Sequence, residues 1–383
     1  MIPALFLHSP GHLDSGGGGV QACSREYFDA LTLAGFELTP VELPPDRRLL
    51  TRLRRRFWSD PYSAWIDTGD AVRRTLTAAR APEWVFVNQH YLGSVAAALR
   101  TVLPTHTRFV MLSHGLESTD FLHELRGVGG GPRADVTKRQ ALMLGWRLIQ
   151  EARQAHAFDH VFCLSEFERE IEHWLGSESV SMIPRTVTPA PLDWEPHGRR
   201  LGFVGTLDHH PNREGLLLFL RAYEALGADG EVRVVGGPEA AGRDLAAEYR
   251  SVRYLGPLAN DLLEAEARTW SCFVHPIFCY ARGASTKLAT ALSWEIPIAT
   301  TPTGRRGYVW RDGGLPTADE PAAFAQLAAS MFDPSRAAAA REQVRKVAAS
   351  SPTLEDVAAM IAAILSPREA VSPILGRNRQ QLP

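Results

Sequence analysis

Residues Leu201–Leu220, LGFVGTLDHHPNREGLLLFL, decide the fold. An apolar run that ends in Gly205 is typical of a buried strand, and the apolar spacing from Asn212 onward indicates a helix. Strand, turn and helix in this order form the unit from which parallel α/β sheets are built. A glycine at the end of the strand lets a ligand approach the backbone closely. The free N–H groups at the start of the helix can hold phosphate oxygens, with Arg213 as a nearby cation.

The alternation of strand and helix continues on both sides of this stretch and fills the 383-residue chain. Short apolar runs predict strands at Ala4–His8, Phe36–Val41, Trp84–Asn88, Phe109–Ser113 and His160–Leu164 before it, and at Val232–Val235, Cys272–His275 and Ile298–Thr301 after it. Helical spacing between the strands predicts parallel sheets covered by helices on both faces. A chain of this length exceeds what one hydrophobic core usually serves, so we expect two domains.

The expected domain boundaries follow from a segment with few apolar residues. Ile183–Arg200 carries four prolines and interrupts the alternation. We therefore expect an N-terminal Rossmann-like domain at 1–185, a linker at 186–200, a C-terminal domain at 201–352, and a helix with a polar tail at 353–383. Two doubly wound sheets joined in this way leave a cleft between them. Such sheets bind ligands at the carboxyl ends of their strands.

The overall composition excludes several classes of protein. A formal net charge of -2 gives no overall attraction to nucleic acid or anionic lipid. No run approaches the ~20 apolar residues of a membrane-spanning helix, and the N-terminal MIPALFLHSPGHLD lacks the basic start of a signal peptide. The four cysteines are scattered without a CxxC pair, which indicates reduced thiols rather than disulfides or a metal site. We expect a soluble, cytoplasmic protein.

A second informative stretch is His275–Gly307, HPIFCYARGASTKLATALSWEIPIATTPTGRRG. Its Gly-Ala-Ser-Thr turn leads into a helix and places N–H groups and two hydroxyls where a diphosphate can bind. Lys287, one turn into that helix, adds a compensating charge. A cation at this point would stabilise a departing nucleoside diphosphate directly.

Together the two stretches resemble the family-four GT-B glycosyltransferases. The first follows the family pattern GFVGxLxxxPNxEGL, and the second shares Pro276, Gly283, Ser285, Lys287, Ala291, Leu292, Pro297, Thr301, Gly304 and Gly307 with it. The resemblance implies the GT-B architecture, in which two Rossmann-like domains with doubly wound parallel sheets face a cleft. It also implies that the C-terminal domain binds a nucleotide-sugar donor and that the N-terminal domain binds the acceptor.

One position departs from the family pattern. Thr290 stands where the family usually has a glutamate that binds the donor ribose, and the nearby Glu295 has a different offset along the helix. We therefore expect the phosphate part of the donor site to match the family more closely than the ribose part.

The expected site combines these motifs with two features of the N-terminal half. A glycine tract, Ser15–Gly19, follows the first strand; such tracts line the cleft in the resembling family, although a flexible loop is the plainer interpretation. His114 follows the strand Phe109–Leu112 and resembles the family's cleft histidine, which contacts the transferred sugar. We expect donor binding by Gly18, Gly19, Gly205, Asn212, Gly283, Ser285, Thr286 and Thr290, and catalytic roles for His114, Arg213 and Lys287. Ser165 and Glu168 predict a capping box at a helix start.

An arginine-rich segment remains outside this scheme. Asp46–Trp58, DRRLLTRLRRRFW, holds six arginines between Arg47 and Arg56. As a helix it could dock on an anionic surface such as the inner face of a membrane, or bind an acidic acceptor. A solvated helix that packs on the domain through its leucines is the plainer interpretation.

The sequence therefore predicts a glycosyltransferase that moves a sugar from a nucleotide-sugar to an acceptor. The resemblance implies retention of anomeric configuration and no cofactor besides the sugar-nucleotide substrate, and no HEXXH, DxD or Cys/His cluster indicates a metal. The acceptor stays open among glycolipid, glycan, small molecule, protein and nucleic acid. Two alternatives remain, a sugar-nucleotide epimerase or hydrolase on the same fold, and a non-catalytic GT-B-like binding module for which Thr290 is the best argument.

Overall fold

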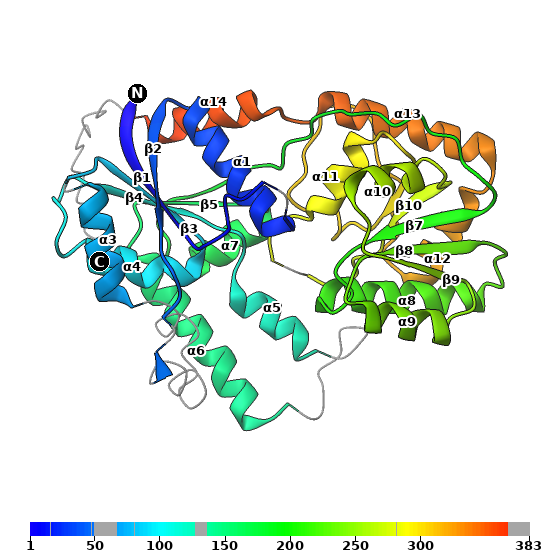
Figure 1. Cartoon of the computed structure of the whole chain (residues 1–383), viewed down its shortest axis with the longest axis horizontal. Helices are drawn as coiled ribbons and strands as arrows, with labels where there is room; N and C mark the ends of the chain where they lie inside the picture. The colour runs from blue at the N-terminus through cyan, green and yellow to red at the C-terminus, as the bar shows by residue number, and fades with distance from the viewer. Residues whose placement is uncertain are drawn as a thin grey trace, which may run out of the picture.

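The computed structural model describes residues 1–15, 17–46, 48–49, 67–79, 81–126, 136–280 and 282–366. They form two α/β domains that lie side by side, the N-terminal one on the left of Figure 1 and the C-terminal one on the right. Each domain is built on one parallel sheet with helices on both faces, as the alternation of strand and helix predicts. The arginine-rich hypothesis for 47–56 falls almost entirely outside the described residues, which include only Arg48 and Leu49 of it.

The N-terminal sheet has the order β2-β1-β3-β4-β5-β6, and every neighbouring pair is parallel. Its strands are β1 Ile2–His8, β2 Phe36–Glu42, β3 Trp84–Asn88, β4 Arg108–Leu112, β5 His160–Cys163 and β6 Val180–Met182. Its helical segments are α1 Gly19–Leu33, α3 Thr68–Ala78, η1 His90–Leu92, α4 Gly93–Leu99, α5 Glu117–Glu124, α6 Lys138–Ala155 and α7 Glu166–Trp174.

Alternate side chains of each central strand enter different cores. Ala4 and Phe6 of β1 pack with α1 on one face of the sheet, and Leu5 and Leu7 pack with α4 on the other. This alternation follows from the two-residue period of a strand. Because both faces are covered, the strands read as continuous apolar runs, which explains why the sequence predicts them well.

The C-terminal sheet has the order β11-β10-β7-β8-β9 and is again parallel throughout. Its strands are β7 Arg200–Val204, β8 Glu231–Val235, β9 Val252–Gly256, β10 Cys272–His275 and β11 Ile298–Thr300. Its helices are α8 His210–Ala225, α9 Glu239–Glu248, α10 Asn260–Ala267, α11 Thr286–Ser293, α12 Pro321–Ser330 and α13 Pro334–Ser350. The sequence analysis did not predict β6, which has three partly exposed residues, or β9, which carries the exposed Arg253 as its second residue.

The chain crosses between the domains twice. Residues 183–199 contain no helix or strand, and their backbone bonds to the C-terminal domain, as in the hydrogen bond from Leu192 N–H to the Trp294 carbonyl at 3.0 Å. The second crossing leads from α13 to α14, Leu354–Leu365, which returns to the N-terminal domain and packs against α1. The two crossings touch, because Val187 N–H donates to the Pro352 carbonyl at 3.3 Å.

No single helix among the described residues is long and apolar enough to cross a membrane. Only α13 and α14 taken together, which meet at a 41° bend, meet that test by length and composition. Three of the four cysteines are buried, Cys279 is partly buried, and all four thiols are free.

Candidate functional site

The chain order reverses at one strand in each sheet. In the N-terminal sheet β1 lies between β2 and β3, and in the C-terminal sheet β7 lies between β8 and β10. The loops that leave such neighbouring strands run to opposite faces and leave a crevice at the carboxyl ends. The two crevices face a single cavity of about 840 Å³. Gly17–Gly19 and Gln89 line it from the N-terminal domain, and Gly205 and the start of α11 line it from the C-terminal domain.

This cavity brings together most of the residues expected from the sequence. They are His114, Lys287, Gly18, Gly19, Gly205, Asn212, Gly283, Ser285, Thr286 and Thr290. Arg213 is the exception, since it is exposed on α8 and does not line the cavity. Successive helix residues point about 100° apart, so the turn that buries Asn212 toward the cavity directs Arg213 to solvent.

Lys287 is fixed at the cavity wall by a chain of hydrogen bonds. Its Nζ donates to Asn212 Oδ1 at 2.8 Å, and Asn212 Nδ2 donates to the Thr206 carbonyl at 3.0 Å. Burial, and then the charge of the nearby Arg306, lower the pKa of Lys287 to about 8. The ammonium group is thus held close to Gly205, where an added Cβ would lie 3.3 Å from Lys287 Cε.

Arg306 is a second cation at the cavity, and the sequence analysis missed it. Its guanidinium donates to the carbonyls of Thr303 and Arg282 at 3.0 and 3.3 Å, so its charge is positioned by backbone groups. Burial lowers its pKa, while Glu168 acts in the opposite sense. The GRRG sequence at 304–307 offers two arginines, and only the fold shows that Arg306 faces the cavity whereas Arg305 is exposed.

Ser285 is the N-cap of α11, and a hydrogen bond to His275 orients its hydroxyl. One ring nitrogen of His275 bonds to Ser285 Oγ at 2.8 Å and the other to Thr300 Oγ1 at 3.0 Å. Burial and the charge of Lys287 lower the pKa of His275 to about 3, so its ring is neutral. His275 therefore holds the Ser285 side chain at the start of α11.

His114 lies on the opposite wall in a defined tautomer. Gln89 Nε2 donates to its Nδ1 at 3.1 Å, so its Nε2 carries the hydrogen and donates to Asn88 Oδ1 at 2.7 Å. Burial lowers the pKa of His114 well below its usual range. Gln89 holds this position with a φ of 91°, a left-handed conformation that is costly for a residue with a side chain and is found most often at functional sites.

Two glycines allow the domains to approach each other beside the cavity. Gly115 has φ of 101°, and a Cβ there would lie 2.3 Å from Arg282 Cβ and 2.5 Å from Gly283 N. Gly283 has φ of 66°, and its Cβ would lie 2.8 Å from the His114 carbonyl oxygen. Either side chain would therefore force the His114 loop away from the loop that precedes α11.

Acidic side chains of α5 and α7 also hold the loop that precedes α11. Arg282 pairs with Glu117 and with Asp120, the latter at 3.1 Å from Nε to Oδ2, and its N–H donates to Asp120 Oδ1 at 2.8 Å. Gly283 N–H donates to Oε1 of Glu168 at 2.5 Å. Burial raises the pKa of Glu168.

The predicted capping box is therefore only half correct. Ser165 Oγ does accept from Glu168 N–H, but the Glu168 side chain contacts Gly283 in the other domain instead of the N-cap.

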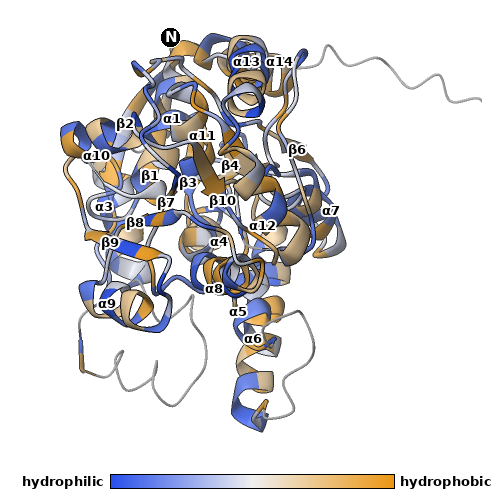
Figure 2. Cartoon of the chain, turned by 90° about the vertical axis from the view of Figure 1, so that its right-hand side faces the viewer, coloured by the Kyte–Doolittle hydropathy of each residue, from blue (hydrophilic) through white to orange (hydrophobic). Residues whose placement is uncertain are grey.

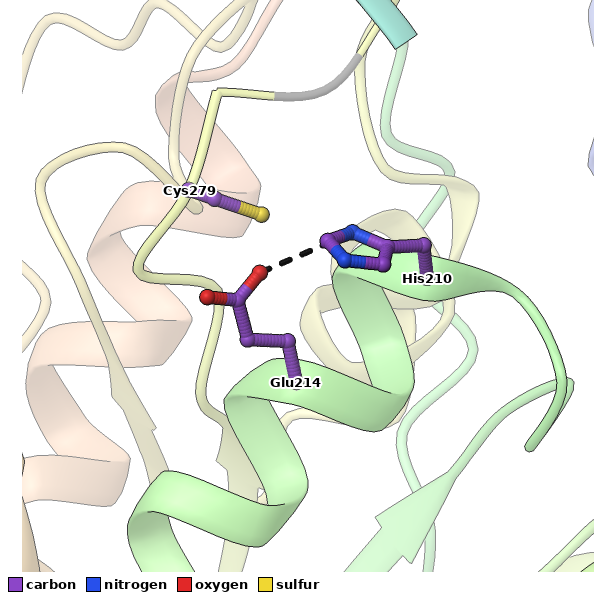
Figure 3. A group of neighbouring side chains, drawn as sticks. All are labelled: His210, Glu214 and Cys279. Carbon is purple, nitrogen blue, oxygen red and sulfur yellow. Dashed lines mark ion pairs between the residues drawn. The ribbon is translucent and has the colours of Figure 1, made fainter. Parts of the chain in front are cut away.

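Three side chains near the cavity have the chemistry of metal ligands. His210, Glu214 and Cys279 offer ligand atoms that all lie within 4.8 Å of one another, and Figure 3 shows their side chains converging from α8 and the loop after β10. The carboxylate of Glu214 lies 3.5 Å from His210 Nδ1 and is hydrogen-bonded to Cys279. Burial, then the Glu214 charge, raises the pKa of the Cys279 thiol to about 12. Within this group, Cys279 thus makes one hydrogen bond and His210 one ion-pair contact to the same carboxylate.

Two glutamates could replace the ribose-binding glutamate that is Thr290 in this chain, and the structure places only one of them at the cavity. Glu295 pairs with Arg345 of α13 at 3.2 Å and does not line the cavity. Glu264 of α10 does line it, together with Asn260 and Thr290. A carboxylate is thus present in the cavity, on a different helix from the one the family pattern uses.

Part of the chain that contains this site is similar to a known protein family. Residues 198–333 match the family model described as glycosyl transferases group 1. The matched residues make up most of the C-terminal domain. The matched range contains Gly205, Asn212 and Lys287, and it covers less than half of the chain. No curated protein matches the sequence.

Solved structures extend the likeness to the whole chain. The sucrose-phosphate synthase of Thermosynechococcus elongatus aligns over 95% of this chain and 98% of its own, with a TM-score of 0.67 and 16% identity. Anabaena HepE in complex with UDP and glucose aligns over 96% of this chain and 100% of its own, with a TM-score of 0.60 and 14% identity. The lipopolysaccharide outer core galactosyltransferase WaaB aligns over 95% and 99%, with a TM-score of 0.55 and 13% identity.

The architecture is therefore GT-B, as the sequence motifs imply. The match of the C-terminal residues to the glycosyltransferase model, together with this fold, identifies the chain as a glycosyltransferase.

Proposed function

We propose that this glycosyltransferase takes its sugar from a nucleotide-sugar whose diphosphate binds at the start of α11. The observation that carries the proposal is the pair of cations, Lys287 and Arg306, at the helix N-terminus that also presents the Ser285 hydroxyl. Helix N-termini favour anions because their first N–H groups have no partner within the helix. The complex of HepE with UDP and glucose, on the same fold, supports a donor of this class.

In this proposal the protein acts on the leaving group. As the bond between the sugar and the diphosphate breaks, negative charge builds up on the phosphate oxygen near Lys287 and Arg306. Cations that are already in position stabilise this charge without rearranging, which lowers the barrier. Gly205, which has no side chain, leaves room for the phosphates next to Lys287.

The transferred sugar would lie toward His114. Because Nδ1 of His114 accepts from Gln89 and Nε2 donates to Asn88, the ring is neutral and held in place. It would hydrogen-bond a sugar hydroxyl by exchanging one of these two partners for the sugar. Among the described residues that line the cavity, Glu264 is the only carboxylate. The departing phosphate would then accept the proton of the attacking hydroxyl, which leads to retention of configuration.

Recognition of the nucleoside would fall to α10. Glu264 and Asn260 line the cavity beside Gly236 and Gly237, which follow β8. A carboxylate that accepts hydrogen bonds from both ribose hydroxyls would fill the role lost at Thr290. Replacing Glu264 by Gln should therefore raise KM for the donor with little change in kcat, because the nucleoside is held equally in ground and transition states.

The reaction would need no metal, since protein cations already face the phosphates. Donor turnover should be the same with EDTA as with added Mg²⁺ or Mn²⁺. A loss of activity in EDTA that is restored by one metal would contradict this part of the proposal.

The test of the proposal is a screen of sugar-nucleotides carrying an isotope label in the sugar. Slow release of free sugar together with nucleoside diphosphate is expected in the absence of acceptor, and Lys287→Ala should slow it about 10²- to 10³-fold. Formation of an epimer would favour the epimerase alternative. Failure of every nucleotide to bind, measured by thermal shift and calorimetry, would contradict a nucleotide-sugar donor.

A further inference from the structure

Helix α6 has a surface unlike that of an ordinary solvent-exposed helix. Figures 1 and 2 show it extending from the body of the N-terminal domain. None of its residues before Glu151 is buried. Leu142 is 63% exposed, Trp146 40% and Ile149 46%. Large apolar side chains that gather on an exposed face usually mark a contact with another apolar phase.

The exposed residues of α6 form one face. Leu142, Trp146 and Ile149 follow one another at spacings of four and three, which places them on the same side of a helix. Continuing this spacing in both directions reaches exposed cations: Lys138 lies four residues before Leu142, and Arg153 four residues after Ile149. We call these five residues, with the exposed Arg139, the outer face of α6.

Contacts on the opposite side fix this orientation. The Arg147 guanidinium lies over the Phe121 ring at 4.0 Å, and Glu151 Oε1 accepts from Ser118 N–H at 3.0 Å. Both partners belong to α5, so the inner side of α6 is held against the domain. The helix cannot rotate its apolar outer face inward without breaking these contacts.

The charges of the outer face indicate the chemistry of its partner. The outer face carries the cations Lys138, Arg139 and Arg153, and residues 136–150 contain neither Asp nor Glu. Two copies of α6 packed on each other would oppose like charges, which disfavours a symmetric pair. An anionic bilayer offers apolar depth for Trp146 and its neighbours and negative headgroups for Lys138 and Arg153, whose long side chains reach outward while their stems stay apolar.

We propose that the outer face of α6 docks the enzyme on the surface of an anionic lipid bilayer. The helix would lie in the interfacial plane and would not span it. Trp146 would sit at headgroup level, where its indole has both an apolar and a polar environment. This docking is independent of the donor site and does not rest on the proposed function.

The test uses the full chain and sedimentation with vesicles. Wild-type protein should bind vesicles of phosphatidylcholine mixed with phosphatidylglycerol at least about tenfold more tightly than pure phosphatidylcholine, and added salt should weaken this binding. Replacing Leu142, Trp146 and Ile149 together by Ser should remove binding, and K138E/R139E/R153E should remove it as well.

A matched control comes from α7. Trp174 is 73% exposed, more than Trp146, but its helix carries Glu166, Glu168, Glu170 and Glu172. Trp174→Ser should leave vesicle binding unchanged. All variants should keep the wild-type melting temperature, which shows that the fold is intact.

Three results would overturn the proposal. The first is wild-type protein that binds anionic and neutral vesicles equally. The second is α6 variants that bind vesicles as tightly as the wild type does, which would move the contact to another segment such as 47–56. The third is a dimer in light scattering that Trp146→Ser dissociates, because the outer face would then be a protein interface.

Discussion

At the residue scale, the donor site depends on Lys287 and on how its charge is held. The ammonium group bonds to Asn212 and lies near Arg306, so its charge is maintained against burial and against a like charge. A bound dianion should stabilise this ammonium group strongly, because its negative charge offsets both the cost of burial and the repulsion from Arg306.

Replacing Lys287 by Ala should therefore lower kcat/KM for the donor about 10²- to 10³-fold, as is typical when one group that stabilises transition-state charge is removed. Arg213→Ala is the matched control, since Arg213 is a cation of the same sequence motif that is exposed and outside the cavity. It should change kcat/KM by less than about twofold. Equal losses in the two variants would show that Arg213 reaches the donor.

The pH dependence of donor binding follows from the same lysine. Its pKa of about 8 means that the ammonium group of the empty site is charged below pH 8 and loses its proton above it. A diphosphate binds the charged form, so each binding event above pH 8 must take up a proton. The Kd of a nucleoside diphosphate should thus rise by up to about tenfold per pH unit above pH 8 and be nearly constant between pH 7 and 8.

Calorimetry in buffers of different ionisation enthalpy measures this proton uptake directly. Lys287→Arg should remove it, because the guanidinium stays charged across this range. Proton uptake that persists in this variant would assign the titration to another group.

Single residues also show where sequence reasoning reaches its limit. The motif around Asn212 predicts a strand, a turn and a helix start correctly, but the direction of each helical side chain depends on how the helix is rotated over the sheet. Arg213 was for this reason placed at the cavity by the sequence, and Arg306 was missed. Glu168 had a sufficient local explanation as a capping residue, whereas its actual partner, Gly283, lies 115 residues away.

At the scale of elements, the loop after β4 and the loop before α11 work as a pair. They meet at Gly115 and Gly283, where neither backbone can carry a side chain without separating the domains. The contact forms only when the two domains are packed together, so neither loop sequence determines it alone.

Gly115→Ala should therefore weaken donor binding as well as stability. Gly35 provides a matched control, because its φ of 98° is nearly that of Gly115 but nothing lies within 4 Å of an added Cβ. Both substitutions should cost about 1–2 kcal/mol of unfolding free energy from the left-handed backbone. Only Gly115→Ala should cost more than this and also raise KM for the donor, as measured by denaturation and initial rates.

The elements themselves were largely predictable. Strands buried on both faces give continuous apolar runs, and every strand expected from the sequence is present within one or two residues. The outer face of α6 was not predictable, because apolar spacing shows that a helix has sides but not which side the domain covers. Residues close together in the sequence determine the strands and the phosphate loop, so these could be predicted. The packing of two domains determines which residues line the cavity, so the lining could not.

At the scale of the molecule, charged contacts join the two domains beside the cavity. Asp120 accepts both the N–H and the guanidinium of Arg282 from the other domain. Asp120→Asn should weaken donor affinity about threefold to tenfold and increase the radius of gyration in X-ray scattering, because a partly buried ion pair is lost.

Asp229→Asn is the control for this prediction. Asp229 pairs with Arg199 at 3.6 Å inside the C-terminal domain and is almost fully exposed. This variant should leave both the donor affinity and the scattering curve unchanged. An unaltered radius of gyration in Asp120→Asn would mean that other contacts suffice to hold the domains together.

The double crossing of the chain determines how these domains can separate. The crossings touch at Val187 and Pro352, along the edge of the molecule that carries α13 and α14 in Figure 1, whereas Asp120 and Arg282 join α5 to the loop before α11. Two attachments placed together act as a hinge with one axis, so sliding and twisting are restrained while rotation stays free. When the domains rotate about this hinge, they separate most at the point farthest from it. The Asp120–Arg282 ion pair lies away from the hinge and must break before the domains separate there.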